Sequence, residues 1–269
     1  MPRIIAFANQ KGGVAKTTSA INFACIWART LPNDKVLFID ADAQANATAV
    51  LINTSFAAGP RQLGVPTIQE VLMEEATAEE ALVAATLHEL TYKGKRFPEK
   101  RLHVLPAHLE LAVIEPMLNT VFRGEYRLKK ALRPLLSHYE LIVIDCPPSL
   151  GALTHNALMC AEEVVIPVSP GAFPIIGLNY LNGTIQRAQE GNPYLRLSGV
   201  LPTMIRNTDV SNHTLEELAE YYGDLLLPPI PLMTVIDEAN LLELDVFSYK
   251  PASRGATAYA RAVNELKGR

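Results

Sequence analysis

Six short apolar segments recur along the 269-residue chain, and they constrain its fold more than any other feature. They occupy residues 3–8, 35–42, 101–107, 139–148, 163–169 and 197–205. Helical segments, such as 151–161 and 214–222, lie between them. Continuous apolar strands that alternate with helices are typical of a parallel sheet covered on both faces. The sequence therefore predicts an α/β fold, with a mostly parallel twisted sheet in a single domain spanning residues 1–269.

The composition argues against several classes of protein. No apolar run approaches the roughly 20 residues that a membrane span requires, and residues 1–10 resemble a strand more than a leader peptide. The three cysteines, Cys25, Cys146 and Cys160, lack metal-like spacing and indicate buried, reduced thiols in the cytoplasm. A formal net charge of −4 argues against a chain coated in basic charge, but it leaves a local basic patch open.

A phosphate-binding loop follows the first predicted strand. Residues 9–18 read NQKGGVAKTT, and a helix is predicted from Lys16 to about Arg29. In this context the backbone N–H groups at the helix N-terminus point at a phosphate group, and the helix dipole favours its charge. Lys16 would reach the β- and γ-phosphates, and the Thr17 hydroxyl would hold Mg²⁺. The predicted nucleotide-binding residues here are Gly12, Gly13, Val14, Ala15, Lys16, Thr17 and Thr18.

The loop departs from the common form G-x-x-x-x-G-K-[ST]. Gln10 and Ala15 stand where its two glycines should be, and glycines occupy positions 12 and 13 instead. If φ of Ala15 were positive, its Cβ would cost about 1 kcal/mol or more. The site must therefore use a negative φ at this residue or tolerate the strain. A plain glycine turn with two solvated lysines is the alternative interpretation, and the strand before and the helix after the loop argue against it.

Aspartates follow two of the predicted strands. Asp40 and Asp42 end the stretch LFIDAD, and Asp145 ends LIVID in a Walker-B-like pattern. In an open α/β sheet, ligands bind beyond the carboxyl ends of the strands. One such aspartate could simply cap the next helix, but two strands that end this way beside a phosphate loop favour a Mg²⁺ site. Its predicted ligands are Thr17, Asp40 and Asp145.

Four stretches resemble the deviant Walker-A ATPases of the ParA and Soj type, in the larger group that also holds MinD. They are KGGVAKTT, FIDADAQANAT, IVIDCPPSLG and SYKPASRGATAYA, and the resemblance covers nearly the whole chain. It implies an ATPase that uses ATP and Mg²⁺ and whose two ATP-bound subunits dimerise face to face. By this resemblance Lys16 binds phosphate within its own subunit, Lys11 reaches the partner's nucleotide, and Asp42 orients the attacking water.

The same resemblance implies an adenine site around Thr203, Met204 and Pro231. Two further stretches of the sequence depart from the family pattern. Ala43 and Ala45 stand where the family often has proline and glycine. The stretch PPIPLMTVIDEAN lacks an arginine that relatives often carry, which weakens any transfer of DNA contacts from that region.

The charge of the chain is unevenly distributed. The last 20 residues carry +4, whereas the preceding 249 sum to −8. A basic terminal helix on an acidic body suits contact with a phosphate backbone, and the segment 123–133 adds five basic residues against one acidic. Solvated helix faces are the alternative for either cluster taken alone. The predicted DNA contacts are Lys250, Arg254, Arg261, Lys267 and Arg269.

The resemblance favours a short, Soj-like ParA that partitions DNA. Its ATP-bound dimer would bind DNA nonspecifically at the nucleoid, and a ParB-like partner would stimulate hydrolysis and release it. Because the first predicted strand starts at residue 3, we expect no separate N-terminal DNA-reading domain. The alternatives are a positioning ATPase for a protein cargo and a MinD-like ATPase on membranes, although a small apolar face on the terminal helix argues against membranes. A metabolic enzyme of the dethiobiotin synthetase or nitrogenase iron-protein kind lacks support.

Overall fold

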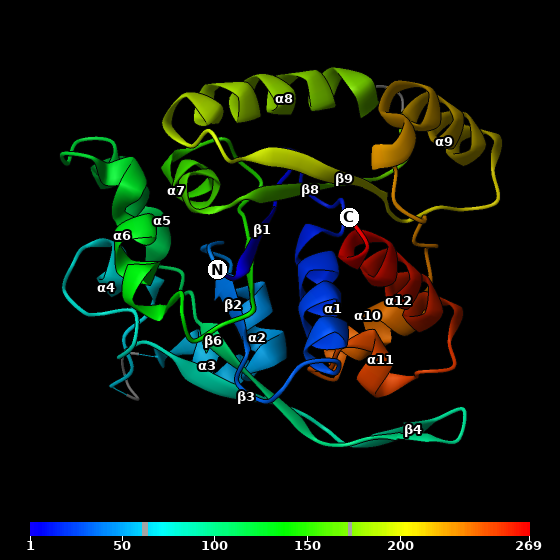
Figure 1. Cartoon of the computed structure of the whole chain (residues 1–269), viewed down its shortest axis with the longest axis horizontal. Coiled ribbons are helices and arrows are strands. Elements are labelled where there is room, and N and C mark those ends of the chain that lie inside the picture. The colour runs from blue at the N-terminus through cyan, green and yellow to red at the C-terminus, as the bar shows by residue number, and fades with distance from the viewer. Residues whose placement is uncertain (61–63, 172–173) are drawn as a thin grey trace.

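A seven-stranded sheet forms the centre of the computed structural model, which describes residues 1–60, 64–171 and 174–269 (Figure 1). The strand order is β3-β6-β2-β7-β1-β8-β9. The strands are β1 Arg3–Phe7, β2 Val36–Asp40, β3 Val83–Leu87, β6 Lys100–Leu105, β7 Leu141–Asp145, β8 Glu163–Val168 and β9 Arg196–Pro202. Neighbouring strands run parallel except β3, which pairs antiparallel with β6 at one edge. The predicted fold class is confirmed.

The central strands are buried on both faces, as their continuous apolar sequences predict. In β1, Ile4 and Ala6 belong to one apolar core, whereas Ile5 and Phe7 belong to the core on the opposite face. The side chains alternate because successive residues of a strand point to opposite sides of the sheet. Both sides therefore need a cover of helices.

Helices supply that cover on each face (Figure 1). The first core joins the sheet to α4 (Ile68–Leu72), α5 (Leu111–Leu118), α6 (Arg127–Leu132), α7 (Ala152–Cys160) and α8 (Pro174–Gly191). The second joins it to α1 (Lys16–Ala28), α10 (Thr234–Leu241), α11 (Val246–Tyr249) and α12 (Arg254–Lys267). The other helical segments are α2 Asn46–Leu51, α3 Thr54–Ala58, α9 Asp209–Tyr222 and the 3₁₀ turns η2 Gly124–Tyr126, η3 Arg133–Leu135 and η4 Gly223–Leu225. Within the described ranges, no helix combines the length and the apolar character needed to cross a membrane.

The stretch SRGATAY near the C-terminus fixes α12 against α1. Ser253 Oγ accepts a hydrogen bond from Ala256 N (3.1 Å) and so caps the helix. Gly255 packs closely, since an added Cβ would lie 3.1 Å from the Ile236 side chain. Tyr259 is fully buried, and its hydroxyl lies 3.3 Å from Ser19 Oγ of α1. α12 therefore braces the helix that follows the predicted phosphate loop.

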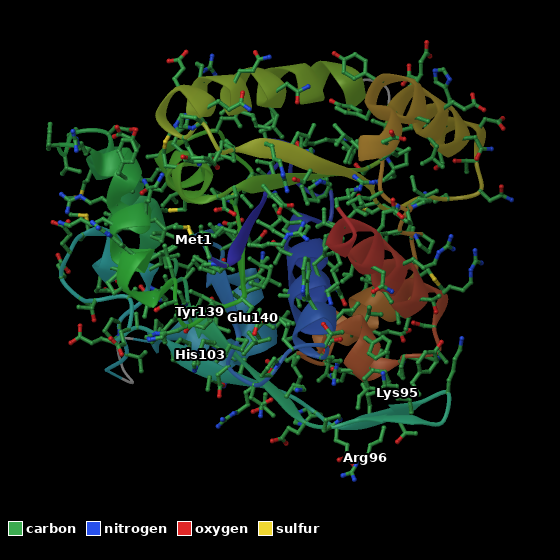
Figure 2. All side chains as sticks on the ribbon, in the orientation of Figure 1. Met1, Lys95, Arg96, His103, Tyr139 and Glu140 are labelled. Carbon is green, nitrogen blue, oxygen red and sulfur yellow. The ribbon has the colours of Figure 1, made fainter. Side chains whose placement is uncertain are left out.

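One of two segments expected to be irregular or exposed differs from the expectation, and the other agrees with it. The loop-like stretch 53–66 contains the short helix α3. The basic stretch 92–101, expected as an exposed turn or hairpin, contributes to a hairpin of β4 (Leu90–Tyr92) and β5 (Lys95–Phe97). This hairpin projects from the body, and Figure 2 labels Lys95 and Arg96 on it. The edge-on packing of Tyr92 and Phe97 against Phe247 holds its base.

Candidate active site

The predicted phosphate loop joins β1 to α1 and is held from two sides. Asn9 Nδ2 donates to Pro167 O of β8 (2.7 Å), and Asn9 Oδ1 accepts from Lys11 N (2.9 Å). Thr203, at the end of β9, donates from Oγ1 to Val14 O (3.0 Å). The backbone of the loop is thus positioned before any ligand arrives. The sequence analysis did not single out Asn9, although a polar residue directly after an apolar strand was a usable signal.

Ala15 adopts the left-handed conformation, with φ 56° and ψ 36°. Of the two possibilities that the sequence left open, the site therefore tolerates the strain, which is worth about 1–2 kcal/mol for a residue with a Cβ. Gly13 is also left-handed (φ 68°), and a Cβ added at Gly12 or Gly13 would meet no atom within 4 Å. The loop backbone is consequently open to a close approach by a phosphate group.

The two lysines of the loop occupy different environments. Lys16, the first residue of α1, is only 6% exposed. Lys11 is exposed, and its Nζ would lie 3.5 Å from a Cβ added at Gly171. Thr17 is half-buried, and so is Thr18, whose hydroxyl accepts a hydrogen bond from Asn240 Nδ2 (3.3 Å). This arrangement suits Lys16 for a ligand bound inside the loop and Lys11 for one outside it.

Asp40 and Asp145 are side by side at the carboxyl edge of the sheet. They are register partners in the parallel pair of β2 and β7, and both are fully buried. Burial raises the pKa of Asp145 well above its usual value; Asp40 raises it further, while Thr17 and Lys16 oppose the rise. Among the described residues, neither Asp145 carboxylate oxygen has a hydrogen-bond partner of ordinary geometry. Asp145 is thus suited to a cation or to water bound to a cation.

Asp40 is already engaged by its own chain. Its Oδ2 accepts hydrogen bonds from Thr48 N and Thr48 Oγ1 (both 2.8 Å), and its Oδ1 accepts from Asp42 N (3.2 Å). Burial raises the pKa of Asp40 to about 6, against the effect of these hydrogen bonds. Thr48 Oγ1 also accepts from Ala107 N (2.9 Å), so it ties the end of β2 to the segment after β6. Sequence reasoning missed Thr48, and the predicted metal role of Asp40 stays a prediction.

Asp42 lies at the mouth of the same site and is 8% exposed. Its Oδ1 accepts from Gln44 N (2.9 Å), and its backbone oxygen accepts from Ala45 N (2.9 Å). Within the described chain, no hydrogen bond to Asp42 Oδ2 is found. One oxygen therefore fixes the side chain, and the other is suited to hold a water molecule.

The site fits a magnesium ion that arrives with a nucleotide. In the described ranges, no group of three His, Cys, Asp or Glu side chains is arranged to hold a metal ion. Mg²⁺ is usually bound in proteins through one or two carboxylates together with phosphate oxygens and water. The buried carboxylate oxygens of Asp145, which lack a hydrogen-bond partner of ordinary geometry among the described residues, and the Thr17 hydroxyl provide such a partial set.

The three predicted adenine residues are brought close together but have different surroundings. Ile205 and Pro231 form a parallel bridge, which carries Pro231 to the end of β9 next to Met204 (φ 56°). Thr203 is fully buried, and its hydroxyl braces the phosphate loop. Pro231 alone of the three lines an open hollow of about 490 Å³.

That hollow also collects basic side chains. Arg254 and Arg261, both predicted to contact DNA, line it together with Arg206, which the sequence did not single out. The adenine and DNA predictions thus meet in one place. Among the described residues, neither Arg254 nor Arg261 has an ion-pair partner. Three guanidinium groups around one hollow make it suited to phosphate groups.

The other predicted DNA contacts are arranged differently. Lys250 is exposed before α12. Lys267 lies over the Trp27 ring (4.9 Å to its centroid) and donates to Thr30 Oγ1. Arg269 donates to Ser198 O (2.9 Å) and to a second backbone carbonyl oxygen. Lys267 and Arg269 are therefore partly occupied by contacts within the chain.

Comparisons with known proteins show which family the chain is similar to. A family described as an AAA domain matches residues 2–197. The chain is 35% identical to the sporulation initiation inhibitor protein Soj of Bacillus subtilis (strain 168), covering 99% of this chain and 98% of that protein. It is also 35% identical to the chromosome partitioning protein ParA of Myxococcus xanthus (strain DK1622), with 99% and 88% coverage.

A solved structure shares the fold. The cobyrinic acid a,c-diamide synthase of Mycobacterium smegmatis, solved with bound ADP and magnesium, matches with a TM-score of 0.78 and 33% identity. The match covers 100% of this chain and 97% of that one. The same fold is therefore found in a protein named for quite different chemistry.

Proposed function

The chain belongs to the AAA-domain family that includes Soj and ParA, and from this premise we propose that it is an ATP-dependent DNA-partition ATPase. One observation carries the proposal. The buried Lys16 begins α1 near the buried carboxylates of Asp40 and Asp145, and hydrogen bonds from Asn9 and Thr203 hold the loop in front of it. A nucleoside triphosphate with Mg²⁺ satisfies both the lysine and the carboxylates.

ATP and Mg²⁺ are the proposed cofactors. The N–H groups of residues 12–18 and the Lys16 ammonium bind the β- and γ-phosphates, and the N-terminus of α1 adds its dipole. Thr17 and Asp145 hold the cation, the latter directly or through water. The structure of the synthase with ADP and magnesium, at 33% identity, supports this assignment.

Hydrolysis and dimerisation are proposed to use the two residues at the mouth of the site. Asp42 orients the attacking water through its Oδ2 atom, since its Oδ1 atom is fixed by Gln44 N. Lys11 is exposed and reaches the nucleotide of a second subunit that closes face to face. A cation supplied in trans stabilises the charge on the transferring phosphoryl group.

Nonspecific DNA is the proposed surface on which the dimer moves. Arg206, Arg254 and Arg261 line one hollow, and this hollow is the proposed contact with the phosphate backbone. The apolar side of α12, formed by Tyr259, Val263 and Leu266, is buried against the body, which argues against membrane insertion by this helix. A ParB-like partner would stimulate hydrolysis and so release the DNA.

The experiment measures DNA affinity of the ATP-bound protein as a function of salt. We expect little sequence preference and an affinity that falls steeply with salt, because neutralised phosphates release counterions. Arg254→Glu combined with Arg261→Glu should weaken binding of every sequence alike and reduce the salt slope by about 0.9 for each phosphate that is no longer neutralised. Arg96→Glu, on the projecting hairpin, is the matched control and should leave binding unchanged. DNA binding that is absent or independent of salt would instead favour a positioning ATPase for a protein cargo.

A further inference from the structure

The solvent-facing side of α5 carries only apolar side chains. Leu109, just before the helix, is 59% exposed, and Val113 and Met117 are 68% and 45% exposed. Ala112 and Pro116 are also exposed between them. A surface helix normally presents polar residues to water, so an apolar face of this kind marks an interaction surface.

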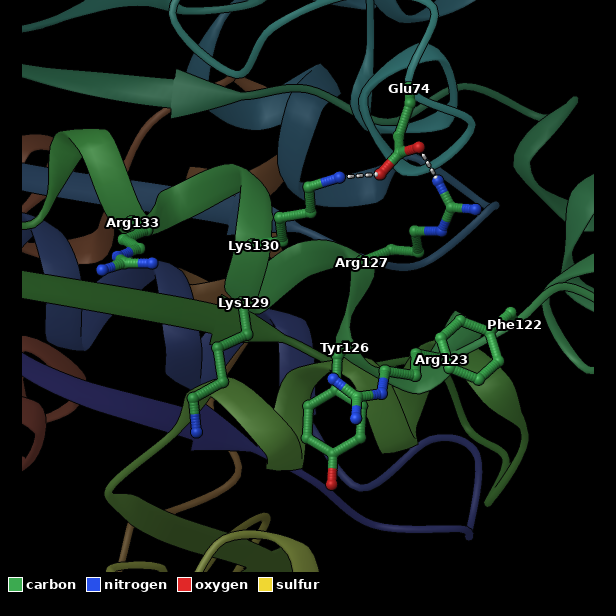
Figure 3. A pocket seen from close by; sticks show the side chains of 8 residues that line it. All are labelled: Glu74, Phe122, Arg123, Tyr126, Arg127, Lys129, Lys130 and Arg133. Atoms are coloured by element: carbon green, nitrogen blue, oxygen red, sulfur yellow. Dashed lines mark hydrogen bonds and ion pairs between the residues drawn. The ribbon is translucent and has the colours of Figure 1, made fainter.

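A basic hollow of about 970 Å³ lies beside the end of this helix (Figure 3). Phe122, which is 85% exposed, lines it, and Val121 N donates to Met117 O in the turn between the two. The apolar face and the hollow therefore meet at Phe122. The hollow is lined by Glu74, Phe122, Arg123, Tyr126, Arg127, Lys129, Lys130 and Arg133.

The hollow keeps a positive charge after its internal pairs are counted. Glu74 takes ion pairs from both Arg127 and Lys130, as Figure 3 shows. Among the described residues, Arg123, Lys129 and Arg133 have no ion-pair partner. The guanidinium of Arg123 lies 5.3 Å from the centroid of the Phe122 ring, so a cation and an aromatic ring lie next to each other in the lining of the hollow. An occupant must therefore bring both apolar side chains and negative charge.

Two other occupants fit these observations less well. Duplex DNA would satisfy the cations, but it would leave the apolar face of α5 without a partner. This surface also lies at the opposite side of the molecule from α12 and its arginines (Figure 1). A second copy would form an isologous interface, in which the same patch of both copies is in contact. Arg123, Lys129 and Arg133 of one copy would then face the same cations of the other and repel them.

We propose that the apolar face of α5 and the basic hollow together dock an acidic, amphipathic segment of a partner protein. The inference rests on the proposed ATPase function, because this surface adjoins the site. Glu115, on the inner side of α5, accepts from Leu153 N of α7 (3.5 Å), and an added Cβ at Gly151 would collide with the Glu115 carboxylate. Gly151 and Leu153 belong to the segment that follows Asp145. A partner on α5 thus touches a helix whose inner side contacts the segment that follows Asp145.

The test uses three fluorescein-labelled 20-residue peptides and the full chain with ATP and Mg²⁺. The first peptide places leucines on one helical face and glutamates elsewhere, the second has the same composition in scrambled order, and the third replaces the glutamates by lysines. Fluorescence anisotropy should give a Kd for the first peptide at least about tenfold lower than for the other two. Val113→Ser with Phe122→Ser, and separately Lys129→Glu with Arg133→Glu, should each raise that Kd about tenfold or more. Leu241→Ser, at an equally exposed apolar residue of α10, should leave it unchanged.

Several outcomes would overturn the inference. They are equal binding of all three peptides, wild-type binding by both double variants, or displacement of the acidic peptide by a 20-base-pair duplex in the Arg254→Glu, Arg261→Glu background. Loss of the ATP-dependent dimer in the Val113→Ser, Phe122→Ser variant would instead assign the apolar face to a second copy. These residues lie outside the nucleotide and DNA sites, so ATP and DNA binding should survive in every variant of this surface. Failure of the peptide test with intact ATP and DNA binding would reject the docking surface alone.

Discussion

Lys16 is the residue on which nucleotide binding should depend most directly. It is a nearly buried cation at the start of α1, and its side chain faces the ligand region and not an apolar core. Lys16→Ala should therefore lose most of its ATP affinity while the fold persists. Calorimetry measures the affinity, and circular dichroism checks the fold. Lys93→Ala, in the exposed hairpin turn, is the control, and unchanged ATP affinity in Lys16→Ala would remove this residue from the site.

Ala15 stores strain that glycine would relieve. Its left-handed backbone costs about 1–2 kcal/mol with a Cβ present. Glycine removes this cost, but it also gives the unfolded chain more conformational entropy, which lowers the free energy of unfolding by about 0.4–1 kcal/mol. Ala15→Gly should thus leave the unfolding free energy unchanged or raise it by up to about 1.6 kcal/mol. Ala260→Gly, inside α12, should lower it by about 1 kcal/mol. Urea denaturation without nucleotide compares the two, and an equal decrease in both variants would contradict the strain at Ala15.

At the scale of the elements, the pairing of β2 with β7 places two carboxylates against each other. Asp40 and Asp145 are register partners, and burial raises the pKa of both, that of Asp40 to about 6. A carboxyl group with a raised folded-state pKa contributes stability at low pH that is lost as the pH rises through that pKa. The ligand-free protein should therefore lose stability from this pair as the pH rises through about 6.

Asp145→Asn removes one of these two charges. In the absence of nucleotide and Mg²⁺, the variant should be more stable than the wild type at pH 7.5, by about 1 kcal/mol or more. The difference should shrink as the pH falls towards 4, where both carboxyl groups are neutral in the wild type. Urea titrations at several pH values measure it, with Asp224→Asn, at an exposed carboxylate, as the control. A difference that does not change with pH would show that the pair is not under charge repulsion.

Elements that are determined by a short run of contiguous residues could be predicted from the sequence. The loop between β1 and α1, the strands that end in Asp40 and Asp145, and the basic hairpin all follow from local patterns. The contacts that hold the loop were not, because Asn9 and Thr203 act on partners 158 and 189 positions away. Strand β3 was also missed, since its sequence VAATL is short and built from small residues. Its position is set by pairing with β6, which no local pattern records.

On the scale of the whole molecule, positive charge is concentrated in two separate places on a chain with a formal net charge of −4. The hollow with Arg254 and Arg261 lies on the side of α12, and the hollow with Lys129 and Arg133 lies beside α6 at the other side (Figure 1). Effects of substitutions at distant sites without shared partners usually add. Charge reversals in the two hollows should therefore impair different ligands independently.

The assembled dimer is where Lys11 and Asp42 should act differently. Lys11 is exposed outside the loop and is proposed to act on the partner's nucleotide, so Lys11→Ala should bind ATP but fail to close the dimer. Its hydrolysis should also fall, because a cation supplied in trans to the phosphoryl group is worth ~10³–10⁵ in rate. Asp42, fixed by Gln44 N, is proposed to orient the water, so Asp42→Ala should bind ATP, dimerise and turn over very slowly.

DNA binding should then separate the two variants, provided that it requires the dimer. Asp42→Ala should hold DNA as a long-lived dimer, whereas Lys11→Ala should not hold it. Light scattering with ATP and Mg²⁺, read beside phosphate release and DNA affinity, measures all three properties in one set of samples. Lys93→Ala is again a suitable control, because it removes an exposed lysine far from the loop in sequence. A monomeric Asp42→Ala, or a Lys11→Ala that dimerises and hydrolyses ATP normally, would show that the two roles are assigned to the wrong residues.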